Sequence, residues 1–244
     1  MELRHAQDGT RGLVKLDFKN AFNCIDRTQF MQQALTHFPQ LSRWIHWTYA
    51  GETNLFFGDA IIKSQTGVQQ GDPLGPLLFS LVIQPLAEEL RTLTVNNKKL
   101  DLTLFYLDDG VLAGDLEVVA EALRLVEQKG AELGLQLNVG KCELVLPAET
   151  PDCDLASLFP TSLLVEPETG APRVLCGGNF ELLGAAIGDA HTCEEYMRER
   201  IEKCSKLLDE LKNFEDPQVA LRLLRNCGGV CRVTHSMRMT PPNL

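Results

Sequence analysis

The stretch LFYLDDGVLAG, residues 104–114, decides the fold, because it sets two adjacent acidic residues between two apolar segments. The apolar segments are typical of buried strands, where a charged side chain is costly unless it is paired or binds a metal. A tight turn lets Asp108 and Asp109 point at one spot, whereas neighbours within a strand face opposite sides of a sheet. The alternative is an ordinary β-turn, since Asp109-Gly110 is also a strong hairpin signal.

A second apolar segment, GLVKLD at residues 12–17, is also typical of a buried strand and ends on the carboxylate of Asp17. Asp26 predicts a helix N-cap with Gln29 as its capping-box partner, and Gly134 is a candidate C-cap. Helical and extended patterns mix without strict alternation, which predicts the α+β class. We expect helices at 27–37, 40–49, 73–87 and 116–133, a hairpin of 53–57 and 60–65, and strands at 100–107, 110–112 and 142–146.

The rest of the chain divides into an acidic segment and a helical one. Residues 148–170 are Pro-rich and carry five acidic residues with no Lys or Arg, which indicates a surface insertion. Two short strands are expected near Val174 and at 182–187, and the pattern becomes helical from Cys193 onward. The sequence therefore predicts one domain over residues 1–190 and a helical segment over residues 191–244.

The composition is that of an ordinary globular protein with an acidic balance. The 244 residues are 44% hydrophobic and 23% charged, which excludes disorder, a fibrous repeat and a disulfide-stapled miniprotein. The net charge of −10 argues against a nucleic-acid binder, which usually carries a basic surface. The acidic excess lies in residues 1–193, because residues 194–244 hold nine Lys or Arg against eight acidic residues.

The sequence carries no secretion signal and no membrane-spanning stretch. The first residues, MELRHAQDGTRG, are polar, and the apolar stretch 73–87 is too short to span a bilayer. The eight cysteines include no CxxC pair, so we expect reduced thiols in an intracellular protein, in the cytoplasm or the nucleus. Cys227, Cys231 and His235 are spaced by four, which predicts one helical face holding either metal ligands or a buried stripe.

A loop rich in Gly and Gln, TGVQQGDPLGP at residues 66–76, precedes the apolar helix. Its small residues let the backbone approach a ligand closely, and Gln69 and Gln70 offer amide donors to a sugar, a base or a phosphate. The alternative is an ordinary loop of Gly and Pro before a helix. Taken alone, this loop does not separate the two interpretations.

The order of five segments gives the specificity. The chain contains, in this order, LVKLDFKNAF at 13–22, TGVQQGDPLGPLLFSL at 66–81, LFYLDDGVLAG at 104–114, GLQLNVGKCELV at 134–145 and ELLGAAIG at 181–188. Together they resemble the palm of a reverse transcriptase (an RNA-directed DNA polymerase) with its blocks A to E. The motif QGDPLGP resembles that of the non-LTR, LINE-like retrotransposon class. The resemblance implies an antiparallel sheet backed by helices and covers roughly residues 12–187.

The resemblance assigns roles to single positions. It implies that Asp17, Asp108 and Asp109, with the backbone carbonyl of Phe18, hold two Mg²⁺ ions, with Mn²⁺ as a possible substitute. The ions would activate a primer 3′-hydroxyl and stabilise the leaving pyrophosphate. The implied substrates and partners are dNTPs, a DNA primer and an RNA template.

Further positions match the nucleotide-binding blocks of the family. The resemblance implies nucleotide contacts by Phe22, Gln70, Gly71 and Tyr106, with Phe22 as an aromatic gate that excludes a ribose 2′-hydroxyl. Lys141 would contact the triphosphate or protonate pyrophosphate. The alternatives are a core side chain for Phe22 and an ordinary surface side chain for Lys141.

The C-terminal segment would be a thumb-like helical region. The arginines of this region that have the fewest acidic neighbours are candidates for phosphate contacts: Arg222, Arg225, Arg232 and Arg238. The alternative is that they lie on a solvated helix face. Only eleven residues precede the first palm block, so we expect a fragment that lacks the basic fingers, and no endonuclease or RNase H pattern is visible. Two other functions stay open, an RNA-templated RNA polymerase and a catalytically idle remnant that binds nucleic acid. The oligomeric state is not indicated.

Overall fold

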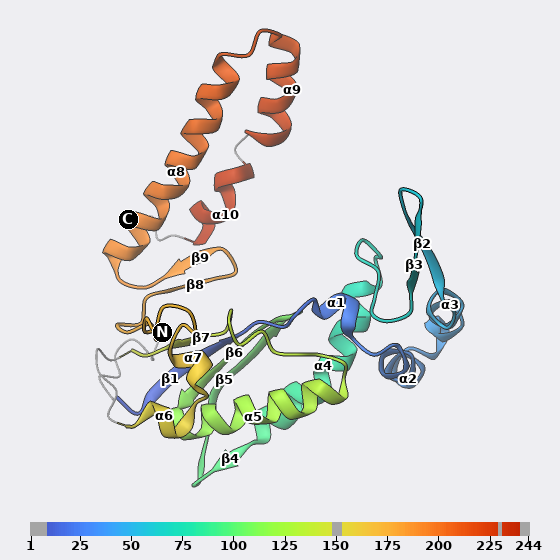
Figure 1. Ribbon diagram of the computed structural model, residues 1–244, viewed down its shortest axis with the longest axis vertical. Coiled ribbons are helices and arrows are strands. Elements are labelled where there is room, and N and C mark those ends of the chain that lie inside the picture. Colours follow the sequence, from blue (N-terminus) through green and yellow to red (C-terminus); the bar gives the residue numbers. More distant parts are fainter. Residues whose placement is uncertain (1–8, 148–152, 229–230, 240–244) are drawn as a thin grey trace. The chain divides into compact units, whose positions relative to one another are not determined.

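The computed structural model describes residues 9–147, 153–228 and 231–239, and each statement below concerns these ranges. The chain divides into an N-terminal unit that ends at Val174 and a C-terminal unit that begins at Leu175 (Figure 1). This division comes earlier than the expected boundary at residue 190, which stays a prediction. Within the described ranges, no helix combines the length and the apolar character that a membrane crossing needs.

A five-stranded antiparallel sheet forms the centre of the N-terminal unit. Its strand order is β4-β5-β6-β1-β7, so the two strands that carry the acidic residues, β1 and β6, are neighbours. The register pairs Leu16 of β1 with Gly110 of β6. The strands are β1 (Arg11–Leu16), β4 (Thr94–Val95), β5 (Lys98–Tyr106), β6 (Asp109–Asp115) and β7 (Glu143–Val145).

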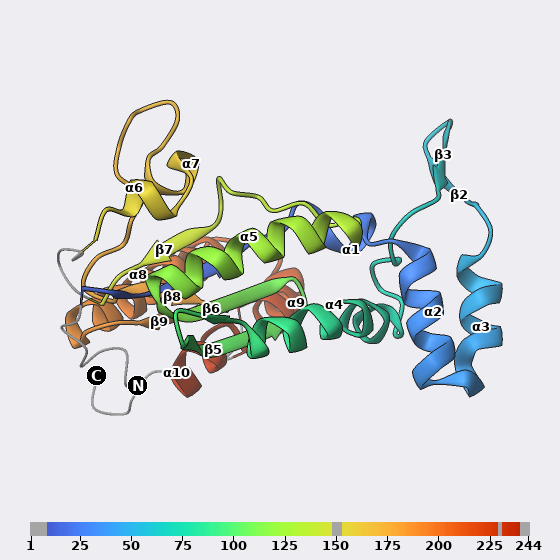
Figure 2. The same cartoon turned by 90° about the horizontal axis from the view of Figure 1, so that it is seen from below.

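Helices α4 and α5 pack against each other and against the sheet, as Figures 1 and 2 show. Their apolar side chains enclose the core together with Val14 and Leu16 of β1. This antiparallel sheet backed by helices confirms the α+β class. The helices of this part are α1 (Ala21–Cys24), α2 (Arg27–His37), α3 (Pro39–Tyr49), α4 (Gly75–Thr92) and α5 (Leu116–Glu132).

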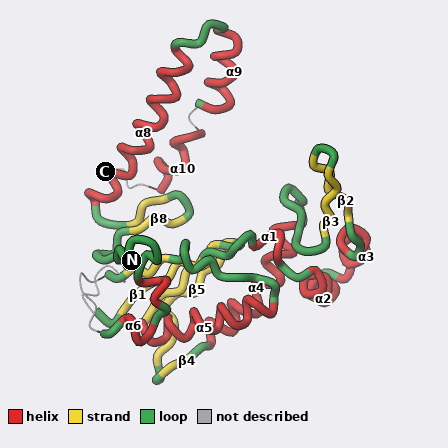
Figure 3. Tube along the Cα trace, in the orientation of Figure 1, coloured by secondary structure: helices red, strands yellow, loops and turns green. Residues whose placement is uncertain are grey.

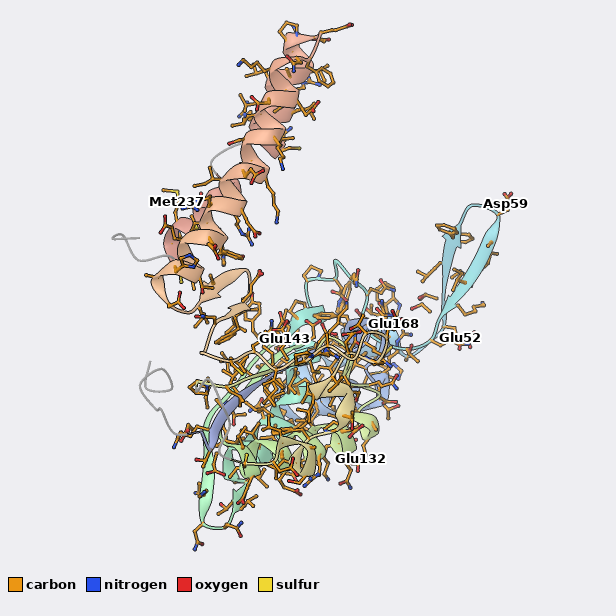
Figure 4. All side chains as sticks on the ribbon, turned by 60° about the vertical axis from the view of Figure 1, so that its left-hand side comes forward. Glu52, Asp59, Glu132, Glu143, Glu168 and Met237 are labelled. Carbon is orange, nitrogen blue, oxygen red and sulfur yellow. The ribbon has the colours of Figure 1, made fainter. Side chains whose placement is uncertain are left out.

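Local sequence signals set several of these boundaries as expected. The Asp26 side chain accepts a hydrogen bond of 2.9 Å from the Gln29 N–H and caps α2, an interaction that contributes about 1 kcal/mol. Gly134 follows α5 with a φ of +78°, as a residue after a helix C-cap often does. Strands β2 (Thr53–Phe57) and β3 (Ala60–Ser64) form the predicted hairpin around Gly58-Asp59, and Asp59 is labelled at its tip in Figure 4.

The expectation of a surface insertion at 148–170 is wrong in part. Residues 148–152 lie outside the described ranges, but α6 (Leu155–Leu158) and α7 (Thr161–Leu164) follow them. Phe159, Leu163 and Leu164 are buried in the core, where α6 lies against α5 and α7 lies against β7. These buried apolar side chains anchor the segment, although its acidic composition predicts a position on the surface. Within the described ranges no strand forms at Val174 either, and the nearby pairing consists of isolated bridges, one of them between Val165 and Pro172.

The C-terminal unit combines a short hairpin with three helices, shown in red in Figure 3. Asp189 caps the longest helix by accepting a hydrogen bond of 2.7 Å from the Thr192 N–H. The expectation that Cys227, Cys231 and His235 share one helix is wrong, because one helix ends at Cys227 and the next begins at Cys231. The elements are β8 (Phe180–Leu182), β9 (Ala185–Ile187), α8 (Ala190–Lys212), α9 (Pro217–Cys227) and α10 (Cys231–Met239).

Candidate active site

Asp17 lies directly after β1, on the side of the sheet that faces away from α4 and α5. Val14, Leu16 and Phe18 point into the core, so by strand alternation Lys15 and Asp17 point to the opposite face. Lys15 forms an ion pair of 2.8 Å with Glu143 of β7 on that face. The half-buried Asp17 therefore sits at the end of a central strand, where its backbone is fixed and its carboxylate is directed out of the core.

The backbone of Asp17 is held by the loop between α5 and β7. The Asn138 N–H donates a hydrogen bond of 2.8 Å to the Asp17 carbonyl, and the Asp17 N–H lies 3.4 Å from the Cys142 sulfur. Burial raises the pKa of the Cys142 thiol, so this sulfur stays protonated and neutral beside the acidic residues. Sequence reasoning missed Asn138 and Cys142, although both lie in the segment that resembles block D.

Asp108 lies in the turn of the β5–β6 hairpin, and Asp109 is the first residue of β6. The turn lies earlier than the Asp109-Gly110 signal predicts. Tyr106 pairs with Asp109, so Leu107 and Asp108 form the turn, and Leu107 takes a φ of +58°. Gly110 lies within β6 instead. A Cβ atom there would come within 2.8 Å of the Phe105 ring and 2.9 Å of a Leu16 side-chain carbon. This glycine therefore permits close strand packing, and the predicted turn position at Asp109-Gly110 is wrong, although a two-residue hairpin turn does form at 107–108.

Strand register brings Asp17 beside the acidic pair. Continuing the β1–β6 register one position beyond Leu16–Gly110 sets Asp17 opposite Asp109, on the same face of the sheet. The pKa of Asp109 is raised, first by partial desolvation and then by the negative charges of Asp108 and Asp17, against a smaller opposing effect of Lys15. Asp17, which is far away in the sequence, therefore shares one electrostatic environment with the adjacent Asp108 and Asp109.

These carboxylates fit a divalent cation by their chemistry, since hard cations such as Mg²⁺ prefer carboxylate oxygens. Their mutual repulsion, seen in the raised pKa of Asp109, is the kind of charge that a cation relieves. Within the described ranges, no group of three or more His, Cys, Asp or Glu side chains is placed so that it could hold a metal ion. The structure thus brings the predicted ligands together without assembling a finished coordination shell.

The loop over residues 66–74 lies against the segment that follows Asp17. The Gly67 N–H donates to the Ile25 carbonyl at 3.0 Å, and the Val68 N–H donates to the Phe22 carbonyl at 2.7 Å. Gly67 has a φ of +70°, and a Cβ atom there would lie 2.3–2.4 Å from backbone atoms of Asn23. Backbone contact of this kind requires glycine, and it fixes the loop beside the strand end that carries Asp17.

The predicted nucleotide-binding residues are positioned differently from one another. Gln70 and Gly71 are exposed on the loop, and Tyr106 is 62% exposed at the end of β5. Phe22 is half-buried and stacks on Phe79 of α4, with ring centroids 4.8 Å apart. Phe22 is therefore a packed side chain as well as a gate candidate.

Lys141 is exposed in the loop between α5 and β7. The backbone N–H of Lys141 donates to the Asn138 carbonyl at 2.8 Å, so Lys141 belongs to the same loop that holds the Asp17 backbone.

The C-terminal arginines lie on the last two helices. Arg222 and Arg225 are exposed on α9, and Arg238 is exposed on α10. The side chain of Arg232 lies outside the described residues. Their predicted role in phosphate contact stays a prediction.

Comparison with protein families gives a match over most of the chain. A family model described as "Reverse transcriptase (RNA-dependent DNA polymerase)" matches residues 2–185. A search of curated proteins gives no match.

Solved structures similar to this chain include three of telomerase. Apo telomerase from Candida tropicalis aligns with 12% identity and a TM-score of 0.46, over 73% of this chain and 31% of its own. Telomerase from Candida tropicalis with a TWJ fragment of telomeric RNA aligns with 11% identity and a TM-score of 0.47, over 76% of this chain and 30% of its own. Telomerase from Candida albicans with the same fragment aligns with 9% identity and a TM-score of 0.41, over 75% of this chain and 30% of its own. The chain spans about a third of the length of these structures.

Proposed function

The chain belongs to the reverse transcriptase (RNA-dependent DNA polymerase) family, and from this premise we propose that it adds dNTPs to a primer 3′-hydroxyl on an RNA template. The observation that carries the proposal is the β1–β6 register, which sets Asp17 opposite Asp109 beside Asp108. Phosphoryl transfer needs positioning and neutralisation of phosphate charge, and convergent carboxylates at a strand end suit that task. The wording QGDPLGP at residues 70–76 supports the non-LTR retrotransposon class.

We assign the metal-holding role to Asp17, Asp108 and Asp109, together with the Phe18 carbonyl. Two Mg²⁺ ions bound there, or Mn²⁺ in their place, would activate the primer hydroxyl and offset the charge on the phosphates. The residues themselves contribute fixed geometry. Asp17 is held by β1 and by the loop at Asn138, whereas Asp108 and Asp109 are held by the β5–β6 hairpin. The raised pKa of Asp109 means that it binds a proton more readily than an isolated aspartate when no cation is near.

Gln70 and Gly71 would meet the incoming nucleotide, because they are exposed on a loop that is bonded to the segment after Asp17. Tyr106 would contact the primer end or the nucleotide from the end of β5. Phe22 would exclude a ribose 2′-hydroxyl, and its stacking on Phe79 would hold the ring in place. Lys141 would contact the triphosphate or protonate the pyrophosphate.

The C-terminal unit would act as a thumb-like segment that contacts the nucleic-acid backbone. Arg222, Arg225 and Arg238 are exposed and suited to phosphate contact, and Arg232 is assigned with them from the sequence. We propose an intracellular location, in the cytoplasm or the nucleus. Seven cysteines, those whose side chains the structure describes, are free thiols, which is usual in a reducing compartment.

Primer extension tests the proposed function. The purified chain is incubated with Mg²⁺, dTTP and oligo(dT) annealed to poly(rA), and product length is followed on a gel. We expect extension by the wild type and a loss of at least about a hundredfold in Asp108→Asn, because that carboxylate positions the reacting groups. Asp59→Asn is the matched control, since it also removes one carboxylate from the N-terminal unit but lies exposed at the β2–β3 tip (Figure 4).

The same assay separates the other two functions. Equal incorporation of UTP and dTTP would favour an RNA-templated RNA polymerase and would contradict the gate role of Phe22. Equal background in the wild type and Asp108→Asn, with retained binding of the primer–template, would identify an idle remnant that binds nucleic acid.

A further inference from the structure

Arg27 is a buried arginine whose side chain faces carbonyl groups. It is 8% exposed and is the first residue of α2. Its Nε donates to the Gly67 carbonyl at 3.0 Å, and its terminal nitrogens donate to the carbonyls of Ser64 at 3.1 Å and Thr66 at 3.2 Å. Further bonds reach the Ser64 hydroxyl at 2.8 Å and the Gly51 carbonyl at 3.4 Å. One guanidinium thus joins the base of the β2–β3 hairpin to the start of the loop 66–74.

The chemistry of this site suits arginine alone among the basic residues. Five donors in a planar fork can serve several acceptors at once, whereas the compact ammonium of lysine cannot span them. Burial lowers the pKa of Arg27, and the ring of Tyr49 lies 5.3 Å from the guanidinium carbon as a cation–π partner. A buried charge is retained here because hydrogen bonds and an aromatic face compensate for the lost water.

Tyr49 carries the connection to the other end of the loop. It is 2% exposed, and its ring also contacts Phe30 edge-on, with centroids 5.1 Å apart. Its hydroxyl donates to the Asp72 carboxylate and accepts a hydrogen bond of 3.3 Å from the Gln69 N–H. Burial and the bond to Asp72 raise the pKa of Tyr49 to about 12, so the hydroxyl stays protonated at neutral pH.

Asp72 forms hydrogen bonds with other residues of the same loop. Its second carboxylate oxygen accepts a hydrogen bond of 2.9 Å from the Leu74 N–H, and its own N–H donates to the Gln69 carbonyl at 3.1 Å. Gln70 and Gly71 lie between these fixed points and are exposed. The loop is therefore anchored on both sides of the two residues that would meet a nucleotide, and both of these residues stay exposed to solvent.

We propose that Arg27, Tyr49 and Asp72 are positioning residues that hold the 66–74 loop in the conformation in which Gln70 and Gly71 receive the incoming dNTP. This inference rests on the proposed polymerase function and adds the residues that act through the loop. None of the three touches the carboxylates at Asp17 and Asp108 in the contacts described, so their effect is on nucleotide binding. Loosening the loop raises the KM for the dNTP and leaves the turnover of bound substrate nearly unchanged.

Tyr49→Phe is the sharpest test, because it removes the hydroxyl but keeps the ring that packs on Phe30 and Arg27. We expect the KM for dTTP to rise about tenfold, with kcat and the KM for primer–template within about twofold of wild type. Hydrogen exchange at the Gln69 amide should become faster, since its acceptor is lost. Tyr196→Phe is the matched control, because the Tyr196 hydroxyl makes bonds of 2.9 and 2.8 Å to Glu181 and Gly184 in the C-terminal unit.

Two further variants keep the test decisive if a single change perturbs folding. Asp72→Asn keeps one acceptor oxygen, for either the Tyr49 hydroxyl or the Leu74 N–H, whereas Asp72→Ala keeps none, so Asp72→Asn should recover part of the nucleotide affinity that Asp72→Ala loses. A merely structural role would lower kcat through a smaller active fraction and would leave the KM for dTTP unchanged. That result in both Tyr49→Phe and Asp72→Ala would overturn the positioning role alone. A wild type that incorporates no dTTP would overturn the proposed function, and the inference with it.

Discussion

Gly67→Ala is expected to destabilise the N-terminal unit far more than an alanine at another left-handed glycine. Two costs combine at this position. A residue with a Cβ pays about 1–2 kcal/mol in the left-handed region, and the φ of Gly67 is +70°. The added Cβ would also lie 2.3–2.4 Å from the backbone of Asn23, so backbone must move, and overpacking of this kind costs about 1–3 kcal/mol. We therefore expect a loss of about 2–5 kcal/mol in the free energy of unfolding.

Gly58→Ala is the matched control for the backbone cost. Gly58 has a φ of +58° at the β2–β3 turn, and no atom lies within 4 Å of the position where its Cβ would be. It carries the left-handed cost of about 1–2 kcal/mol without the clash. The difference between the two variants, about 1–3 kcal/mol, isolates the contact between the loop and the segment after Asp17.

Equilibrium urea unfolding, followed by far-UV circular dichroism, measures both variants. The midpoint should fall in the order wild type, Gly58→Ala, Gly67→Ala, with an unchanged slope, since a changed slope would indicate altered compactness. Equal midpoints for the two variants would show that the 66–68 backbone does not press on Asn23. The Gly/Gln loop would then not be packed tightly against the segment that follows Asp17.

Three other outcomes concern titrating groups. Because the folded pKa of Asp109 is raised, its ionisation destabilises the fold, so Asp109→Asn should raise the melting temperature at about pH 7 and not at about pH 3. The pKa of Tyr49, raised from 10.0 to about 12, predicts that wild-type stability falls as pH rises through that interval, a loss that Tyr49→Phe should lack. The pKa of Asp189, lowered to about 2 chiefly by the Thr192 N–H, predicts that α8 loses helicity by circular dichroism as pH falls from about 4 to about 2, and that Asp189→Ala removes this dependence.

Local signals in the sequence predict the elements that depend on neighbouring residues. Helix 27–37 has the predicted bounds because Asp26 caps it, and Pro39 begins the next helix. The β2–β3 hairpin follows from Gly58-Asp59 between two apolar runs. In each case the residues that determine the element lie within it or beside it.

Several features that depend on distant residues were predicted wrongly or not at all. The side chain of Arg27 is buried because carbonyl groups from Gly51 to Gly67 converge on it, and no local pattern indicates this. Phe159 enters the core although its segment is acidic, because its packing partners lie elsewhere in the chain. The β5–β6 turn falls at Leu107 rather than at the Asp-Gly signal, since pairing along the strands outweighs the preference of one dipeptide.

Gly110 explains how the carboxylates come to lie together. The space that its missing Cβ would fill is occupied by Phe105 of β5 and Leu16 of β1, at 2.8 and 2.9 Å from that point. A larger residue would have to displace the Phe105 ring and the Leu16 side chain, which fill this space beside the end of β1 and the start of β6. The acidic site is therefore set by the packing of three neighbouring strands rather than by a flexible turn. A rigid strand framework holds charged groups at a fixed spacing despite their repulsion, which is the condition that binding of a divalent cation requires.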